Sequence, residues 1–212
     1  MFPLISSQIR VSVNEFAHRD AGLRGVDHRL RVIGGRLSGR RFRVPPGEVR
    51  PTSDRVREAL FGRLGALDGV RALDLYAGSG ALGIEAISRG AAEATFVERE
   101  SQTLEVLRAN LAALGIDSIA SVAPGDVPAV IRRLGRANER FDLVLIDPPY
   151  ASEEPTRAFE ALVGSEVLSA GAMVVLERDK RHPSPNVEGL SAVDERRYGD
   201  TVVARFVAGP TQ

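Results

Sequence analysis

Four consecutive residues, Asp147, Pro148, Pro149 and Tyr150, form the group in this chain best suited to do chemistry. They follow the apolar run 143–146, which predicts a buried strand of a parallel sheet. Each proline removes a backbone donor and fixes φ, so the pair makes a stiff, non-helical exit from that strand. Such an exit holds an acid, a carbonyl and an aromatic ring at the carboxyl edge of the sheet, where open α/β folds bind ligands. The alternative is a strand terminator that happens to carry Asp and Tyr.

A second group is the glycine-rich segment that follows a short apolar strand predicted at 72–76. Gly78, Gly80 and Gly83 allow a tight turn and a close approach of the backbone to a ligand, with helix amides pointing at it. The spacing also matches the G-x-G-x-x-G pattern of dinucleotide-binding proteins. Glu98 even lies 20 residues after Gly78, where that pattern places a ribose-binding acid. The glycines alone therefore leave the ligand open.

Asp74 distinguishes a dinucleotide from S-adenosylmethionine as the ligand of this segment. It lies inside the predicted strand, four residues before Gly78, where a loop that binds pyrophosphate has little use for a negative charge. S-adenosylmethionine has no phosphate and carries an ammonium and a sulfonium cation instead. A carboxylate at 74, with Ser79 and backbone amides nearby, suits that cationic amino-acid part. The alternative for Asp74 is a strand-edge acid that only caps the glycine loop.

The elements that must position these groups alternate between strands and helices. Short apolar runs predict strands at 72–76, 94–98, 119–123, 143–146 and 173–177, with helical periodicity between them. Repeated strand–helix units predict a parallel sheet with helices on both faces. The segment 30–44 predicts a small hairpin, and 190–197 with 201–207 predicts a terminal antiparallel hairpin.

Helix boundaries and core faces can also be predicted. Thr52 or Ser53 can cap a helix ahead of the first sheet strand, and Gly115 ends the helix that follows Glu98. The helix after the glycine segment has one apolar face, made by Leu82, Ala86 and Ile87.

The net charge is zero, but basic residues gather in the N-terminal part of the chain. Residues 1–64 carry 13 Arg against 6 acids, and within 28–50 seven arginines face only Glu48. Of the 28 basic residues 27 are arginines, the side chain that forks onto phosphates and stacks on bases. An arginine-rich segment ahead of a catalytic site predicts an arm that binds nucleic-acid phosphates; the alternative is a solvated charged face.

Composition excludes several other classes. The chain has no cysteine, and His18, His28 and His182 form no ligand cluster, so we predict no disulfide and no metal. No segment approaches the roughly 20 apolar residues that span a bilayer, and no signal peptide is evident. These features predict a cytoplasmic protein without a membrane partner.

Taken together, the motifs resemble those of a known family. Asp-Leu-Tyr-Ala-Gly-Ser-Gly at 74–80, an acid after the next strand, and Asp-Pro-Pro-Tyr at 147–150 resemble class I methyltransferases that act on exocyclic amines. Upstream, Arg-Val-Ile-Gly-Gly at 31–35, Gly-Arg-Arg at 39–41 and Arg-Pro-Thr-Ser-Asp-Arg at 50–55 narrow the match. The chain is similar, from about 29 to 206, to the RsmD family of bacterial 16S rRNA guanine-N2 methyltransferases.

This resemblance implies an α/β, Rossmann-like fold of the class I methyltransferases, with a seven-stranded, mostly parallel sheet whose last strand is antiparallel. It implies three parts: a flexible arm at 1–28, a basic extension at 29–66 made of a hairpin and a helix, and the methyltransferase domain at 67–212. S-adenosylmethionine would be the cofactor and 16S rRNA, free or in a 30S particle, the partner. We expect a monomer.

The resemblance also implies roles for individual residues. The expected catalytic residues are Asp147, Pro148, Pro149 and Tyr150. The expected cofactor contacts are Asp74, Tyr76, Ala77, Gly78, Ser79, Gly80, Gly83, Glu98, Arg99, Asp126, Val127 and Asp147. The expected RNA contacts are Arg36, Arg40, Arg41, Arg43, Arg50, Thr52 and Arg55. Within this set, Glu98 would accept from the ribose hydroxyls and Asp126 from the adenine amine, although Gly-Asp before a helix is also common capping chemistry.

The expected mechanism follows from the weakness of the guanine N2 amine, whose lone pair is delocalised into the ring. Asp147 and the Pro148 carbonyl would each accept one N2 proton and so direct the lone pair toward the sulfonium methyl. Tyr150 would stack on the extruded base.

Rival functions use parts of the same motifs. Asp-Pro-Pro-Tyr sites also serve adenine-N6 methylation of DNA and glutamine methylation of release factors. A nicotinamide-dependent oxidoreductase would use the glycines but offers no role for Asp74 or the double proline. A catalytically silent RNA-binding protein would fail to bind the cofactor.

Overall fold

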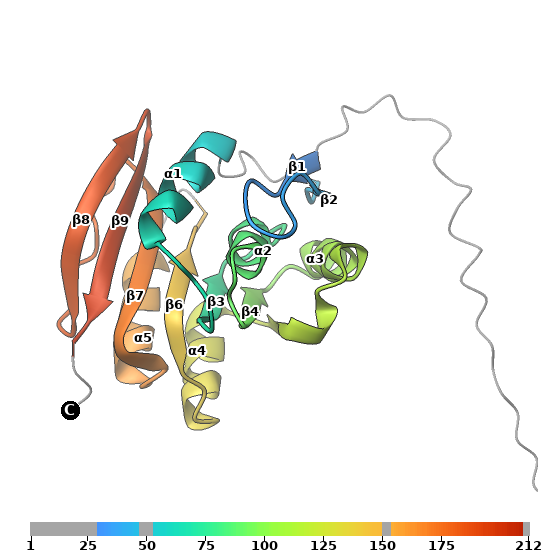
Figure 1. Cartoon of the computed structure of the whole chain (residues 1–212). Helices are drawn as coiled ribbons and strands as arrows, with labels where there is room; N and C mark the ends of the chain where they lie inside the picture. The colour runs from blue at the N-terminus through green and yellow to red at the C-terminus, as the bar shows by residue number, and fades with distance from the viewer. Residues whose placement is uncertain (1–28, 47–52, 150–153, 210–212) are drawn as a thin grey trace, which may run out of the picture.

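A seven-stranded sheet forms the centre of the molecule in the computed structural model, which describes residues 29–46, 53–149 and 154–209 (Figure 1). The strand order is β5-β4-β3-β6-β7-β9-β8. The strands are β3 (Arg71–Leu75), β4 (Glu93–Glu98), β5 (Ala120–Pro124), β6 (Phe141–Ile146), β7 (Leu168–Asp179), β8 (Leu190–Tyr198) and β9 (Thr201–Ala208). The pairs among β3 to β7 are parallel, whereas β9 is antiparallel to both β7 and β8. The predicted α/β fold with a C-terminal antiparallel hairpin is confirmed.

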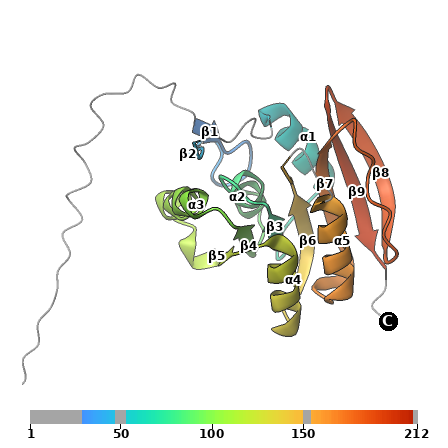
Figure 2. The ribbon, with the colours of Figure 1, turned by 180° about the vertical axis from the view of Figure 1, so that it is seen from behind.

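Helices cover both faces of this sheet, and each face has its own core. The helices α1 (Asp54–Leu64), α2 (Ala81–Ser88) and α3 (Ser101–Leu114) pack on one face, where Leu145 and Val175 are buried. The helices α4 (Val127–Arg136) and α5 (Glu154–Gly164) pack on the other, around Phe159 and Val144 (Figure 2). A short 3-10 turn, η1 (Asp117–Ile119), precedes β5.

The predicted N-terminal hairpin is present as β1 (Arg29–Arg31) and β2 (Arg41–Arg43). Leu30 pairs with Phe42, and both pack toward the core that α1 and α2 share with the sheet. The flanking pairs consist of arginines alone, and their side chains are exposed. The alternation that predicted the hairpin therefore separates a buried apolar face from a cationic face.

Glu85 on α2 fastens this hairpin to the rest of the protein. Its buried carboxylate accepts hydrogen bonds from the backbone amides of Ile33 and Gly34, each at 2.8 Å, and from Nε of Arg89 at 2.7 Å. Arg57 on α1 is also fully buried, with its Nη1 3.9 Å from Oε2 of Glu85. The sheet core, α1 and the hairpin thus meet at one buried ionic cluster.

Two elements differ from the sequence predictions. The helix α2 is buried on every side rather than along one apolar face, because the hairpin covers its outer side. The strand predicted at 173–177 extends over Leu168–Asp179, since Leu168 pairs with Phe141 of β6 and antiparallel pairing with β9 continues to Asp179. The predicted N-terminal arm at 1–28 lies outside the described residues.

Candidate active site

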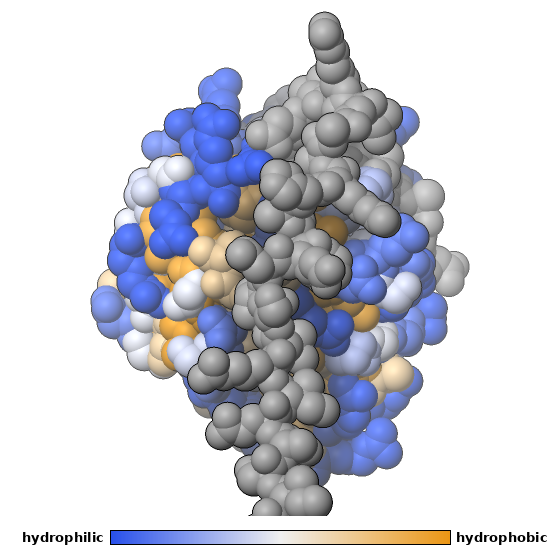
Figure 3. Space-filling model, turned by 90° about the vertical axis from the view of Figure 1, so that its right-hand side faces the viewer, coloured by the Kyte–Doolittle hydropathy of each residue, from blue (hydrophilic) through white to orange (hydrophobic). Residues whose placement is uncertain are grey.

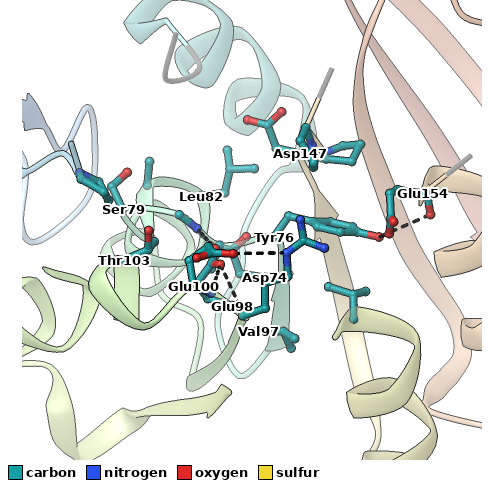
Figure 4. A pocket seen from close by; sticks show the side chains of 18 of the residues that line it. Asp74, Tyr76, Ser79, Leu82, Val97, Glu98, Glu100, Thr103, Asp147 and Glu154 are labelled. Carbon is teal, nitrogen blue, oxygen red and sulfur yellow. Dashed lines mark hydrogen bonds and ion pairs between the residues drawn. The ribbon is translucent and has the colours of Figure 1, made fainter. Parts of the chain in front are cut away.

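A pocket of about 560 Å³ lies at the carboxyl edge of the sheet, where the segments after β3, β4, β5 and β6 converge (Figure 4). The parallel pairing of β3 with β4 and β6 brings these segments together. Its wall consists of Pro45, Pro46, Asp74, Tyr76, Ala77, Gly78, Ser79, Ala81, Leu82, Val97, Glu98, Arg99, Glu100, Thr103, Gly125, Asp126, Val127, Asp147, Pro148, Pro149 and Glu154. The volume lies within the range of small-molecule sites.

Asp74 lies on β3 at the floor of this pocket and is only 1% exposed. Its Oδ2 accepts a hydrogen bond from the Gly83 amide at 2.8 Å. The carboxylate therefore caps the glycine loop, as the alternative reading held, and it also lines the ligand pocket. One carboxylate does both, because it has about four acceptor positions.

The loop between β3 and α2 needs its glycines for conformation and space. Gly78 and Gly80 have φ of 54° and 86°, in the left-handed region that favours glycine. A Cβ at Gly83 would lie 2.4 Å from Cε1 of Phe96 and 3.0 Å from Oδ2 of Asp74. Gly80 and Gly83 thus shape this segment and are not among the residues that line the pocket; their contacts with the cofactor stay predictions.

Glu98 at the end of β4 is held by the backbone around it. Its Oε2 accepts from the Gly78 amide at 3.1 Å, and Oε1 accepts from the amides of Arg99 and Glu100 at 2.7 and 2.9 Å. These bonds leave the carboxylate fixed in orientation at the pocket wall.

Asp126 occupies the N-cap position of α4, yet its side chain makes no capping hydrogen bond. The side chain is exposed and lines the pocket, and the adjacent Val127 is buried. The alternative role of Asp126, a side-chain cap of α4, is therefore not seen in the structure.

Asp147, Pro148 and Pro149 follow β6 directly and form the wall of the pocket opposite the glycine loop. In Figure 4 the Asp147 side chain stands above Tyr76, on the far side of the pocket from Thr103. The Asp147 segment and the glycine loop line one and the same cavity. Tyr150 lies outside the described residues.

Tyr76 and Glu154 form a contact that the sequence did not predict. The Tyr76 hydroxyl donates to Oε2 of Glu154 at 2.9 Å, across 78 positions of the chain (Figure 4). Burial, followed by the adjacent Glu154 carboxylate, raises the pKa of the Tyr76 phenol, which keeps it a neutral donor. Tyr76 also has a φ of 61°, unusual for a residue with a side chain. Residues held in this way cluster at functional sites.

The lining charges indicate what the pocket can hold. Six carboxylates line it, and Arg99 is the one basic residue among its described lining residues. Such a wall suits a cationic ligand and disfavours a pyrophosphate, so the pocket fits S-adenosylmethionine better than a nicotinamide dinucleotide. The six are Asp74, Glu98, Glu100, Asp126, Asp147 and Glu154.

The predicted RNA-binding arginines lie outside this pocket. Arg36, Arg41 and Arg43 are exposed on or beside the hairpin, and Arg55 is exposed on α1. Arg40 is exposed as well, but its Nη2 donates to the Ala113 carbonyl at 2.7 Å and so ties the hairpin to α3. The predicted contacts at positions 50 and 52 fall outside the described residues.

Several lining residues were not predicted. Pro45, Pro46, Glu100, Thr103 and Glu154 come from segments without a motif. The double proline at 45–46 follows directly on the hairpin predicted at 30–44 and repeats the pair at 148–149.

The described residues contain neither a metal-binding group nor a membrane-spanning helix. Among them, no group of three or more His, Asp or Glu side chains is placed to hold a metal ion. No helix in 29–46, 53–149 or 154–209 has the length and apolar character to cross a membrane.

Comparison with known proteins gives consistent results. The family model described as Conserved hypothetical protein 95 matches residues 30–207. Ribosomal RNA small subunit methyltransferase D of Escherichia coli is 35% identical over 180 residues, which cover 84% of this chain and 88% of that protein. A candidate rRNA methyltransferase of Bacillus subtilis, YlbH, is 35% identical over 181 residues, covering 84% and 98%. The solved structure of a candidate methyltransferase from Escherichia coli, yhhF, has a TM-score of 0.76 at 32% identity and covers 86% of this chain and 99% of that one.

Proposed function

We propose that this chain, which belongs to the Conserved hypothetical protein 95 family, transfers a methyl group to the N2 amine of a guanine in 16S rRNA. The family match and the 35% identical Escherichia coli relative confirm the resemblance to the RsmD family. The chain is accordingly an S-adenosylmethionine-dependent rRNA methyltransferase. The guanine and its N2 amine are the proposed part.

The observation that carries this proposal is the placement of Asp147, Pro148 and Pro149. They form one wall of the acidic pocket whose opposite wall is the glycine loop. An amine presented at this wall faces two acceptors, the Asp147 carboxylate and the Pro148 carbonyl. Because Pro149 follows, Pro148 is restricted to an extended ψ, which limits the direction of its carbonyl.

We assign the pocket residues to parts of the donor as follows. Asp74 and the amides of the glycine loop would hold its methionine part. Glu98, already oriented by three backbone amides, would accept from the ribose hydroxyls. Asp126 would accept from the adenine amine beside Val127. Bound there, the donor supplies an electrophilic methyl group on a positively charged sulfur.

The chain's own residues would make the amine reactive. Asp147 and the Pro148 carbonyl each accept one N2 proton, which draws the nitrogen toward tetrahedral geometry and localises its lone pair. The nitrogen forms a bond to the methyl carbon while the carbon–sulfur bond breaks, and the aminium product then loses one proton. Positioning and electrostatics account for this step without a covalent enzyme intermediate.

We propose the basic extension at 29–66 as the RNA-binding part, ahead of a methyltransferase domain at 67–212. Arg41 and Arg43 lie on the exposed face of the hairpin, and β2 leads directly to Pro45 and Pro46 in the pocket wall. A cationic face continuous with the active site can grip phosphates on both sides of the target base. Figure 3 views the molecule from the side of the hairpin and α3, where hydrophilic residues make up much of the visible surface.

The proposal is tested by transfer of labelled methyl from S-adenosylmethionine to small-subunit rRNA from a strain that lacks the gene. The modified RNA is digested to nucleosides, and the labelled product is identified by mass spectrometry. We expect N2-methylguanosine. A labelled N6-methyladenosine, or label only in protein, would instead support one of the rival methyltransferase functions.

A further inference from the structure

A second, smaller cavity lies on the other side of the Asp147-Pro148-Pro149 wall. Its volume is about 30 Å³, and Glu177, Arg178, Asp179 and His182 complete its lining together with Pro155. Asp147, Pro148 and Pro149 are the residues that line both cavities. The space is enough for one or two water-sized polar groups, so a base could place only part of its edge in it.

Glu177 is the carboxylate that lies next to Asp147 along the sheet. Ile146 at the end of β6 pairs with Leu176 of the adjacent parallel strand β7. Asp147, the first residue after β6, therefore lies beside Glu177, the next residue of β7. Glu177 is 6% exposed and lies at the cavity wall. Its position is fixed from the other side by the pairing of Glu177 with Val203 on β9.

Asp179 and Arg178, two charged residues of this wall, pair with Arg181 and Glu195, which lie outside its lining. Asp179 accepts from the backbone amide and the guanidinium of Arg181 at 2.8 to 2.9 Å, and this neighbour lowers the pKa of Asp179. Arg178 donates to both carboxylate oxygens of Glu195 and to the His182 carbonyl. These contacts build a rigid frame around the Glu177 side of the cavity.

We propose that Glu177 reads the target base by accepting the N1–H of guanine while Asp147 and Pro148 hold the N2 amine. This inference rests on the proposed function and extends it to the choice of base. Guanine presents adjacent donors at N1 and N2, and two neighbouring carboxylates match that edge. Adenine presents an acceptor at N1, which a carboxylate repels. Glu177 would therefore select guanine over other purines with an exocyclic amine.

The test uses a small-subunit rRNA fragment carrying either guanine or 2-aminopurine at the modified position. 2-Aminopurine keeps the N2 amine but has an unprotonated N1. We expect wild-type kcat/KM for guanine to exceed that for 2-aminopurine by at least about tenfold, because a site built for a donor rejects its absence. Glu177→Gln should lower kcat/KM for guanine by roughly ten- to a hundredfold. It should also reduce the ratio of kcat/KM for guanine to kcat/KM for 2-aminopurine, since the glutamine amide can donate to the unprotonated N1 of 2-aminopurine.

Two further variants serve as controls. Glu188→Gln removes the same charge at an exposed position. Its kcat/KM for guanine and its preference for guanine over 2-aminopurine should equal those of the wild type. Glu177→Asp keeps the charge and should keep the preference for guanine at a lower rate. S-adenosylmethionine binding, measured by calorimetry, should be unchanged in all variants and reports that they are folded.

The outcomes separate the two proposals. If the wild type methylates guanine but Glu177→Gln leaves both kcat/KM and the ratio unchanged, base reading by Glu177 is wrong and the proposed function stands. If Glu177→Gln does not fold, the wild-type ratio of kcat/KM for guanine to kcat/KM for 2-aminopurine tests the inference, and a ratio near one overturns it. If the wild type methylates no guanine, the proposed function fails, and the inference fails with it.

Discussion

Replacing Glu85 by glutamine tests whether the buried ionic cluster attaches the N-terminal hairpin to the methyltransferase core. The carboxylate is fully buried, and both of its oxygens accept hydrogen bonds from the hairpin backbone. In glutamine one of these oxygens becomes an amide nitrogen, which would face the N–H of Ile33 or Gly34. The change also removes the charge beside Arg57, whose Nε and Nη1 have no hydrogen-bond partner among the described residues.

The magnitude follows from the burial of the pair. Removing one partner of a buried ion pair costs about 3–5 kcal/mol, because the remaining charge is poorly compensated; here Arg57 would keep only the part-exposed Asp54 carboxylate as a partner. For a domain of this size each kcal/mol lowers the Tm by about 2–4 °C, so Glu85→Gln should lower it by about 6–20 °C. Amide exchange at Ile33 and Gly34 should accelerate more than exchange in β3 if the hairpin detaches first.

Thermal unfolding and hydrogen exchange followed by mass spectrometry measure these effects. The matched control is Glu93→Gln, which removes the same charge from a half-exposed ion pair with Arg71 and should cost less than about 1 kcal/mol. If Glu85→Gln is no more destabilising than Glu93→Gln, the cluster does not fasten the hairpin and our reasoning on it is wrong.

Two further predictions concern RNA and cofactor binding. The double variant Arg41→Glu/Arg43→Glu should weaken rRNA binding and make the slope of log K against log salt less steep by about 2. The control Arg132→Glu/Arg133→Glu on α4 should leave the affinity and the slope unchanged. Filter binding at several salt concentrations measures both quantities, and equal effects of the two double variants would show that the hairpin does not take part in RNA recognition. Gly83→Ala should weaken S-adenosylmethionine binding, measured by calorimetry, and lower the stability by about 1–3 kcal/mol, since its Cβ would lie 2.4 Å from the Phe96 ring of β4. A Gly83→Ala variant with wild-type affinity and wild-type Tm would contradict the packing argument.

Much of the fold could be predicted because short apolar runs and glycines mark local structure. The hairpin at 30–44 alternates apolar and arginine residues, and β1 and β2 place those arginines on the exposed face. The carboxyl ends of parallel strands meet at one edge, so the acids after three strands were predicted to share a site. They do line one pocket, while their roles toward the cofactor remain proposals.

What the sequence could not predict depends on contacts between distant segments. Tyr76 and Glu154 meet across 78 positions, and no local pattern links them. The burial of Glu85 was hidden because α2 was read as a helix with one solvent-facing side. Glu85 is the single charged residue of an otherwise apolar or small helix, and a Glu is rarely fully buried unless it is paired, so its burial depends on partners from α1 and the hairpin. The extra length of β7 arises from pairing with β6 at its start and with β9 at its end, which periodicity alone does not reveal.

The most direct test of the central claim compares the wild type with Asp147→Ala in two measurements on the same protein samples. Calorimetry gives S-adenosylmethionine affinity, and labelled methyl transfer to small-subunit rRNA gives turnover. Because Asp147 is proposed to hold the amine, we expect the variant to bind the donor with near wild-type affinity and to transfer no detectable methyl. Near-normal transfer by Asp147→Ala would contradict the proposed mechanism.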